Sequence, residues 1–520
     1  MTDVVVVGAG HNGLVAAILL SRAGLRVEVL ERDEMVGGAC RTETPFGAAP
    51  DLRVSTGAYL LGLMPPELLG TLGVDLPLVR RDPHYFLPTV DGRYLLLGGD
   101  AGQARQQFAE FFTEADARAD EALRTELAAL AADLAPAWLR EPLPVEETAE
   151  RYLRPELRDR FVSLVRGSAM EYLTSFGFAS ELVTAMYAVT DGMPGLTGSP
   201  WTPGSGHNLL VHNMCRLPGA DGTWMVVRGG MGTVTRTLAR AAVDAGAVIR
   251  TGVSVTGMVT NGATVTGVRC DDGTEITARA VLAATDPYRL PALLGDACPA
   301  PLAERIDGYA AQSGGQTMKV NLALSDLPRF SALPEPRGQH GTTVHLLPQP
   351  ASDGSVLTAV RTAFEAAAAG KLDPLPPVEW YMHSTLDPSL SDAEGRHSSA
   401  LFVQGVPHQP AGSTWAAEKD GYVDRLLNFV EQFAPGLSRL VVDTYPLAPP
   451  DIEEHFGITG GNIFHVNNAI SFTDRMPYRT GVDGLYAGAA GCFPAGSVIG
   501  CAGHNAAQVM LADLGIPTGT

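Results

Sequence analysis

The stretch VVVVGAGHNG, residues Val4–Gly13, decides the fold of this chain. Its four β-branched residues are too few for a helix and predict a strand buried on both faces, as in a parallel sheet. The glycines are spaced G-x-G-x-x-G, and after Gly13 apolar residues recur at helical spacing as far as Gly24, a natural helix end. A second short strand, Arg26–Leu30, is followed by Glu31. This order of strand, glycine turn, helix, strand and acid predicts one complete βαβ unit.

Each glycine of the turn has a separate purpose in a dinucleotide site. Gly8 permits the tight turn, Gly10 lets the backbone approach a pyrophosphate, and Gly13 lets helix and strand pack closely. The helix N-terminus offers free N–H groups to phosphates, and Glu31 is suited to accept hydrogen bonds from ribose hydroxyls. A carboxylate there repels a 2′-phosphate, which argues against NADP. A glycine turn without a ligand is the alternative, but the flanking elements favour a bound dinucleotide.

A second glycine pair follows in RDEMVGGACRTE, residues Arg32–Glu43, where Gly37 and Gly38 precede Arg41. An NAD site has no need of these residues. A flavin, in contrast, continues past the pyrophosphate, and a glycine pair lets the backbone lie against its ribityl chain. The alternative is a simple surface turn.

Two later segments complete a resemblance to a known family. Residues Gly229–Val259 begin GGMG and predict a helix after Gly232 and a strand around Val253, and residues Gly484–Gly515 contain PAGSVIGCAGHNAA. With GHNGLVAA at the start, the chain resembles the phytoene desaturase-like and amine oxidase-like FAD oxidoreductases. It is most similar to the subgroup called phytoene dehydrogenase-like or pyridine nucleotide-disulfide oxidoreductase domain-containing proteins. The second of these names fits poorly, because the chain has neither a second G-x-G-x-x-G nor a redox dithiol.

The resemblance implies FAD as the cofactor and adds residues to its site. The backbone at Val253 is expected to face the adenine. The closing segment contributes Gly488, Gly500, His504 and Asn505, with a strand at Leu485–Ala487 and a helix whose N-terminus points at the pyrimidine edge of the flavin. For His504 and Asn505 the alternative is a polar pair bonded to local backbone.

The implied fold is α/β, with a discontinuous Rossmann-type FAD-binding domain and an α+β substrate or cap domain. We expect the FAD-binding domain at residues 1–82, 218–300 and 455–520, and the cap domain at residues 83–217 and 301–454. Helical spacing over residues 101–166 predicts a helical cap, and short strands in 311–324 and 343–408 predict a sheet over the flavin. The Gly- and Pro-rich residues 194–208 predict a loop, which gates substrate entry or crosses the surface.

One strand carries the candidate catalytic residue. QTMKVNLAL, residues Gln316–Leu324, alternates with period two, which places Met318 and Val320 on one face and Thr317 and Lys319 on the other. By resemblance, Lys319 occupies the position from which a lysine of flavin amine oxidases reaches flavin N5 through a water. Its role there is to handle protons or to assist oxygen reduction. The alternative is a lysine on a solvated sheet edge.

Composition excludes several classes of function. The net charge of −20 repels nucleic acid and anionic membranes. No apolar stretch approaches the ~20 residues of a membrane-spanning helix, so any membrane contact is peripheral. The apolar start lacks a basic n-region, which favours a cytoplasmic protein over a secreted one. The six cysteines form no C-x-x-C pair, and no metal site is indicated.

These observations predict an FAD-dependent oxidoreductase, a desaturase or dehydrogenase, that removes a hydride from an apolar organic substrate. The expected partner is a small lipophilic molecule, carotenoid-like or a secondary-metabolite intermediate. Three alternatives stay open: a flavin amine oxidase that uses oxygen, a redox-neutral flavin isomerase, and a flavin-binding interaction protein without turnover. His207, His212 and Trp224 flank the central FAD segment and are candidates for the cavity wall.

Overall fold

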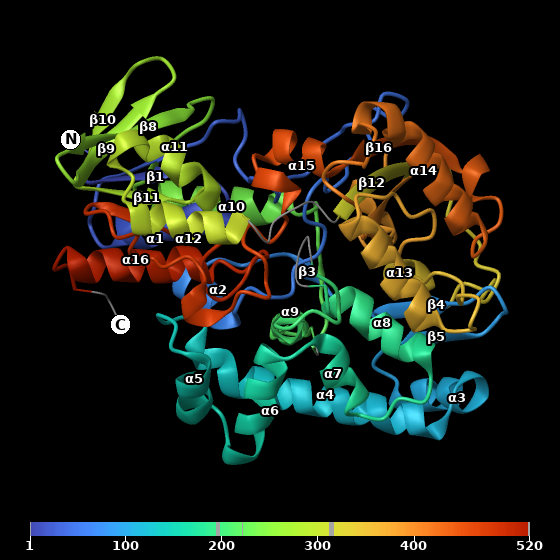
Figure 1. The fold of residues 1–520 in the computed structure, drawn as a ribbon. Helices are drawn as coiled ribbons and strands as arrows, with labels where there is room; N and C mark the ends of the chain where they lie inside the picture. The colour runs from blue at the N-terminus through green and yellow to red at the C-terminus, as the bar shows by residue number, and fades with distance from the viewer. Residues whose placement is uncertain (1, 194–197, 221, 311–316, 518–520) are drawn as a thin grey trace.

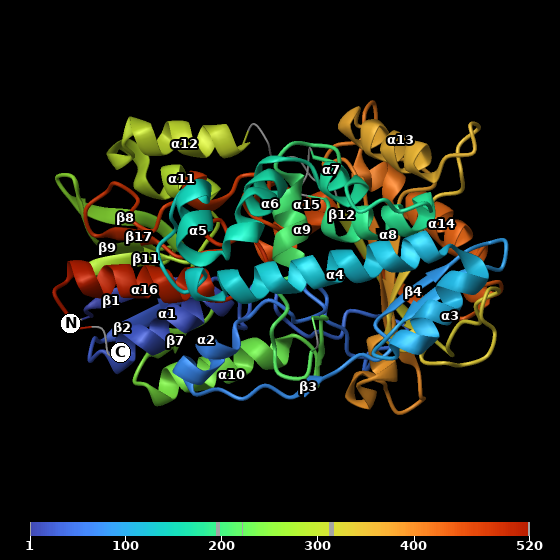
Figure 2. The same cartoon turned by 90° about the horizontal axis from the view of Figure 1, so that it is seen from below.

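The computed structural model describes residues 2–193, 198–220, 222–310 and 317–517. Figure 1 shows two large groups of strands, one toward each side of the molecule, with a layer of helices beneath both. The first group contains a parallel sheet of five strands, and the second is a sheet of seven. In Figure 2 helix α4 (Glu114–Leu134) runs across the central part of the molecule.

The five-stranded sheet is built around the N-terminal strand. Its order is β17, β11, β1, β2, β7, and every neighbouring pair is parallel. The strands are β1 (Val4–Val7), β2 (Val27–Leu30), β7 (Val248–Arg250), β11 (Ala280–Ala283) and β17 (Leu485–Ala487). All residues of β1 are buried, because it has a strand on each side. The structure therefore confirms the Rossmann-type α/β fold and the strand predicted at each end of the chain.

Helix α1 (His11–Arg22) begins earlier than predicted. The expected start was after Gly13, but the Leu14 N–H already donates to the Gly10 carbonyl at 3.0 Å, so Gly13 lies in the first turn. The helix starts here because Gly10 is still extended, with φ −69° and ψ 169°, and the chain turns directly after it. The predicted end is confirmed by Gly24, which has φ +86°.

Two further helices pack on α1, namely α10 (Gly232–Asp244) and α16 (Cys501–Asp513). Both confirm the predicted helices of the central and closing segments. The contact between α1 and α16 requires glycine at position 503. A Cβ atom on Gly503 would lie 2.0 Å from the Asn12 carbonyl oxygen. Glycine at this position therefore lets the last helix of the chain lie directly on the first.

A small antiparallel sheet of β8 (Val255–Asn261), β9 (Thr264–Cys270) and β10 (Glu275–Thr277) follows. The hairpin predicted at Asp272 and Gly273 is confirmed between β9 and β10. The strand predicted around Val253 is wrong. Val253 lies between β7 and β8, because Gly252 adopts φ +66° and ends the extended run.

The seven-stranded sheet has the order β16, β12, β15, β14, β13, β4, β5 and is antiparallel except for the β13–β4 pair. Its strands are β4 (Tyr85–Pro88), β5 (Tyr94–Leu97), β12 (Thr317–Leu324), β13 (Thr343–Leu346), β14 (Val378–Tyr381), β15 (His397–Gln404) and β16 (Val441–Leu447). One face packs on α14 (Trp415–Glu431), through Met318, Val320, Leu322 and Leu324 of β12. The period-two prediction holds for these residues, while Gln316 lies outside the described residues.

The helical layer is formed by α3 (Ala101–Phe111), α4, α5 (Val145–Tyr152), α6 (Pro155–Arg166), α7 (Ala169–Thr174), α8 (Glu181–Asp191) and α9 (Ser205–His212). The helical cap predicted for 101–166 is present. Among the described helices, none is both long and apolar enough to cross a membrane.

Two local predictions are wrong. The loop expected over 194–208 ends earlier, because Gly204 with φ +84° turns the chain into α9; residues 194–197 lie outside the described residues. The strands expected over 343–408 are interrupted by α13 (Val356–Ala368), an alanine-rich helix capped by Ser355.

Gly503→Ala tests the contact between the first and last helices. The added Cβ meets backbone, which cannot rotate away, so we expect the free energy of unfolding to fall by about 1–3 kcal/mol or more. Gly308→Ala is the control, because Gly308 lies inside α12 (Ala300–Ala310) with open space around it. It should be neutral or stabilising by up to about 1 kcal/mol. Urea unfolding followed by circular dichroism measures both, and equal effects would contradict the assignment.

Candidate functional site

A cavity of about 720 Å³ extends from the glycine turn of β1 to the face of the seven-stranded sheet that α14 does not cover. This volume is typical of pockets that hold cofactors and small molecules. Seven predicted site residues line it: Gly8, Gly10, Glu31, Gly37, Gly38, Val253 and Lys319. The structure thus brings residues from both ends of the expected site into one space.

The turn at the cavity's narrow end has the geometry that a pyrophosphate requires. Gly8 has φ +102°, and a Cβ on Gly13 would lie 2.1 Å from the Gly8 carbonyl oxygen. A Cβ on Gly10, in contrast, would meet no atom within 4 Å, so the backbone there is open to a ligand. No described side chain caps the N-terminus of α1. Its first N–H groups are therefore available to an anion.

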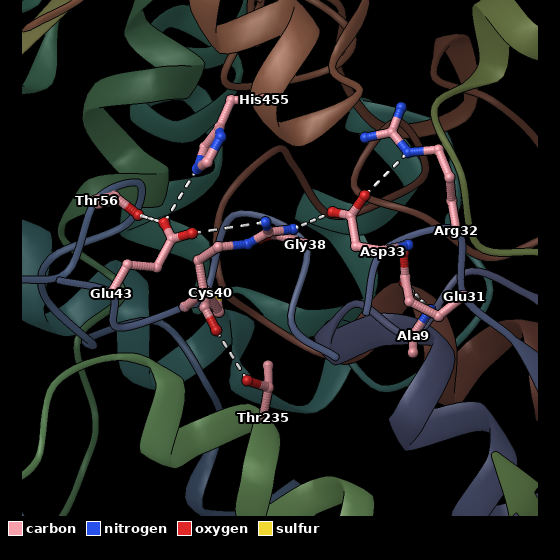
Figure 3. A network of polar contacts seen from close by, with 11 residues as sticks. Ala9, Glu31, Arg32, Asp33, Gly38, Cys40, Glu43, Thr56, Thr235 and His455 are labelled. Carbon is pink, nitrogen blue, oxygen red and sulfur yellow. Dashed lines mark hydrogen bonds and ion pairs between the residues drawn. The ribbon is translucent and has the colours of Figure 1, made fainter. Parts of the chain in front are cut away.

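Glu31 is held in place at the end of β2. Its carboxylate accepts hydrogen bonds from the Ala9 N–H at 2.8 Å and the Asp33 N–H at 3.1 Å (Figure 3). The side chain is buried and lines the cavity next to the glycine turn. This is the place expected of a carboxylate that accepts hydrogen bonds from a ribose.

The second glycine pair lies against the first turn rather than at the surface. The Gly37 N–H donates to the Ala9 carbonyl at 3.0 Å, and Gly37 and Gly38 have φ +136° and +55°. Arg41 does not line the cavity. Its guanidinium donates to the Gly38 carbonyl at 2.7 Å and pairs with Asp33 at 2.5 Å. Arg41 thus ties the two turns together, and its contact with a cofactor stays a prediction.

Lys319 is buried on β12, the second strand of the sheet, between β15 and the edge strand β16, so the alternative of a solvated edge is wrong. Its ammonium group donates to the carbonyls of Ser55 and, at 2.6 Å, of Gly57, and it lies 4.9 Å from the centre of the Tyr59 ring. Burial lowers the pKa of Lys319 well below its usual value. Its catalytic role stays a prediction.

Sequence reasoning missed most of the substrate side of the cavity. Its wall includes the aromatic residues Tyr59, Tyr381 and Phe402, with ring centres of Tyr59 and Tyr381 4.3 Å apart, together with Glu379 and Arg81. The alternation of VEWY in β14 was the only local signal for Glu379 and Tyr381. Tyr59 and Arg81 lie outside regular strands, where no periodicity marks them.

Two of the three residues that were predicted for the cavity wall beside the central FAD segment do line the cavity. His212 and Trp224 line it, and His212 Nδ1 lies 3.3 Å from a carboxylate oxygen of Asp191. His207 does not line the cavity, because it is buried against the Asn468 carbonyl at 2.7 Å.

Several predicted residues do not line the cavity: Gly13, Arg41, Gly488, Gly500, His504 and Asn505. Asn505 donates to the carbonyls of Trp138 and Arg140 and to the Tyr478 hydroxyl, and it bonds His504 at 2.8 Å. Asn505 is thus bonded to backbone that lies more than 360 residues earlier in the chain, and not to the local backbone of the alternative. Cys492 and Cys501 do not line the cavity either, whereas Cys40 does, and all six cysteines are free.

Figure 3 also shows Glu43 bonded to His455 and Thr56 beside this site. The Glu43 carboxylate lies 3.0 Å from His455 Nε2 and joins the N-terminal segment to α15 (Pro449–Phe456). The sequence offers no signal for this pair, since the two residues are far apart in the chain.

Comparison with known proteins agrees with the resemblance. Residues 13–349 match the family of flavin-containing amine oxidoreductases. The chain is 34% identical to the mouse pyridine nucleotide-disulfide oxidoreductase domain-containing protein 2, covering 98% of this chain and 94% of the relative. It is 27% identical to hydroxyneurosporene desaturase of Cereibacter sphaeroides, over 98% of both chains. A solved putrescine oxidase mutant shares the fold, with a TM-score of 0.60, 18% identity and coverage of 99% and 98%.

The cofactor is FAD, and the residues present fit it. Besides the open backbone at Gly10, four buried polar atoms of residues in the cavity wall have no hydrogen-bond partner among the described residues: His11 Nε2, Asp286 Oδ1, Thr317 Oγ1 and His465 Nδ1. Buried polar atoms are rarely left unpaired in proteins. A polar ligand with both donors and acceptors, such as FAD, can satisfy them.

Glu31→Gln tests the ribose site. Loss of the charged acceptor should weaken FAD binding about 10- to 100-fold, since hydrogen bonds to charged groups contribute about 1.5–3 kcal/mol. Glu34→Gln is the matched control, because Glu34 is exposed and does not line the cavity. Titration of the apoprotein with FAD measures both affinities. If the two variants bind FAD equally well, Glu31 has no part in the site.

Lys319→Met tests the lowered pKa. Between that pKa and about 10.4, the folded wild type binds fewer protons than the unfolded chain, so Lys319 makes unfolding less favourable as pH rises. Within that pH interval, we expect the difference in unfolding free energy to shift toward the wild type by up to about 1.4 kcal/mol per pH unit. Lys371→Met, at an exposed lysine, should run parallel to the wild type. If the unfolding free energies of Lys319→Met and the wild type depend on pH in the same way, the pKa of Lys319 is ordinary.

Proposed function

Because the chain belongs to the family of flavin-containing amine oxidoreductases and is a flavin-dependent oxidoreductase, we propose that it removes a hydride from a C–H bond of a small, largely apolar substrate. The product would carry a new C=C or C=N bond. The observation that carries this proposal is the single cavity shared by the glycine turn and an aromatic sheet face. The name of the desaturase relative supports the C=C reaction.

Bound FAD supplies the two-electron acceptor. The chain's own part is to hold the substrate and keep water away. Tyr59, Tyr381 and Phe402 form an apolar wall next to Lys319, which favours a substrate with a flat or extended apolar body. A dry, shaped wall of this kind orients the reacting C–H bond and needs no protein nucleophile.

Lys319 is the residue that we propose to handle protons. Two carbonyls, of Ser55 and Gly57, hold its nitrogen in place. Since burial lowers its pKa, Nζ can release and accept a proton at a pH below the usual range of a lysine. An exposed lysine with an ordinary pKa would stay protonated there.

An amine oxidase is the second candidate, and the observation that favours it is the carboxylate of Glu379 beside two tyrosines. An ammonium group can bind both a carboxylate and aromatic ring faces. Glu379 already accepts hydrogen bonds from Tyr381 and, at 3.0 Å, from Gln404. These hydrogen bonds already stabilise the negative charge of Glu379, so it has less need of a substrate ammonium group. This favours the dehydrogenase over the amine oxidase.

The reoxidation of chemically reduced enzyme separates the two candidates. We expect air to reoxidise the flavin slowly and a soluble benzoquinone to do so at least about tenfold faster, because a dehydrogenase passes electrons to an acceptor other than oxygen. Stopped-flow absorbance of the flavin measures both rates. Faster reoxidation by oxygen would favour the amine oxidase, and a protein that cannot be loaded with FAD would contradict both.

A further inference from the structure

Arg81 is a buried cation in the cavity wall that the proposed reaction does not use. Its side chain is only 2% exposed. Nε donates to the Trp224 carbonyl at 2.8 Å, and Nη1 donates to the Thr343 hydroxyl at 2.8 Å and the His84 carbonyl at 3.3 Å. All three acceptors are uncharged. The Nη2 amino group has no partner among the described residues.

No carboxylate of the described residues forms an ion pair with Arg81. Glu379 lines the same cavity and attracts the guanidinium, but its carboxylate accepts hydrogen bonds from Tyr381 and Gln404. Arginine stays charged even when buried, and a buried charge without a paired charge is costly. The cavity wall thus holds a positive charge without a counter-ion among the described residues, and its Nη2 group is free to donate.

The order of the strands shows how far Thr343, which accepts a hydrogen bond from Arg81, lies from Lys319 across the sheet. Lys319 on β12 pairs with Phe402 on β15, and Phe402 pairs with Glu379 on β14. Thr343, which holds Arg81, lies one strand further, on β13. Three strand spacings separate β12 from β13, which is about 14 Å. The aromatic wall occupies the surface between the two cations.

We propose that Arg81 binds a carboxylate of the substrate, and that the substrate is an amphipathic carboxylic acid whose apolar body lies along the aromatic wall toward Lys319. The inference rests on the proposed function, since it places the oxidised C–H bond at the Lys319 end. A carboxylate fits better than a phosphate monoester, because the single positive charge of one guanidinium balances a single negative charge, and the free Nη2 group can donate a charge-assisted hydrogen bond to a carboxylate oxygen.

Three probes of equal length test this on the wild-type holoenzyme: 4-phenylbutyrate, 4-phenylbutyramide and 4-phenylbutylamine. Each is titrated while the visible absorption of the flavin is followed. The carboxylate should bind at least about tenfold more tightly than the amide, because hydrogen bonds between ionised groups are stronger than neutral ones. Equal affinities, or tighter binding of the amine, would overturn the proposal.

Arg81→Gln should remove the preference for the carboxylate and leave the affinity for the amide unchanged. Arg80→Gln is the matched control, because the neighbouring Arg80 side chain is 40% exposed and does not line the cavity. A carboxylate preference retained in Arg81→Gln overturns the proposal. Should that variant not retain FAD, the three wild-type titrations decide. If the protein holds FAD and is reoxidised as expected but shows no preference for the carboxylate, the inference about Arg81 is refuted. The proposed function would still stand.

Discussion

The close approach of helix α1 to strand β1 is the contact on which the rest of the structure depends. A Cβ at Gly13 would overlap the Gly8 carbonyl oxygen, so only glycine lets the helix begin directly after the strand. The helix N-terminus then faces the cavity, and the second glycine pair and Glu31 lie beside it. At the other side of α1, Gly503 lets the last helix lie on Asn12. The two ends of the chain are thereby joined around one turn.

The cavity brings together residues that lie far apart in the sequence. Its dinucleotide end is formed by the first forty residues, and its substrate end by strands from the middle of the chain. The burial of Lys319 and Arg81 in this space has an energetic cost that their neutral partners reduce only in part. Sites where charges are held at such a cost are often functional. In our proposals, Lys319 handles protons at one end of the cavity and Arg81 binds the substrate at the other.

The sequence predicted those parts of the fold and of the site that depend on patterns within a few consecutive residues. The β1 turn, Glu31 and the alternation of apolar and polar residues along β12 are examples. The burial of Lys319 did not follow from this alternation, because a polar face also fits a solvated sheet edge. The prediction failed where tertiary contacts decide. Strands β4 and β5 join a sheet whose other members follow more than two hundred residues later, and no local pattern shows such pairing. Arg81 and Tyr59 reach the cavity from irregular segments, whereas Asn505 bonds Trp138 and Tyr478, and His504 bonds Asn505.

A crystal structure of the FAD-bound chain tests the central claim most directly, namely that one cavity joins the cofactor to the aromatic sheet face. The account predicts the pyrophosphate at Gly10 and the N-terminus of α1, and the flavin ring against β12 with Lys319 as the nearest basic side chain. The substrate space would then extend from the ring to Arg81. A flavin ring that lies away from Lys319, or a ring that fills the space up to Arg81, would contradict it.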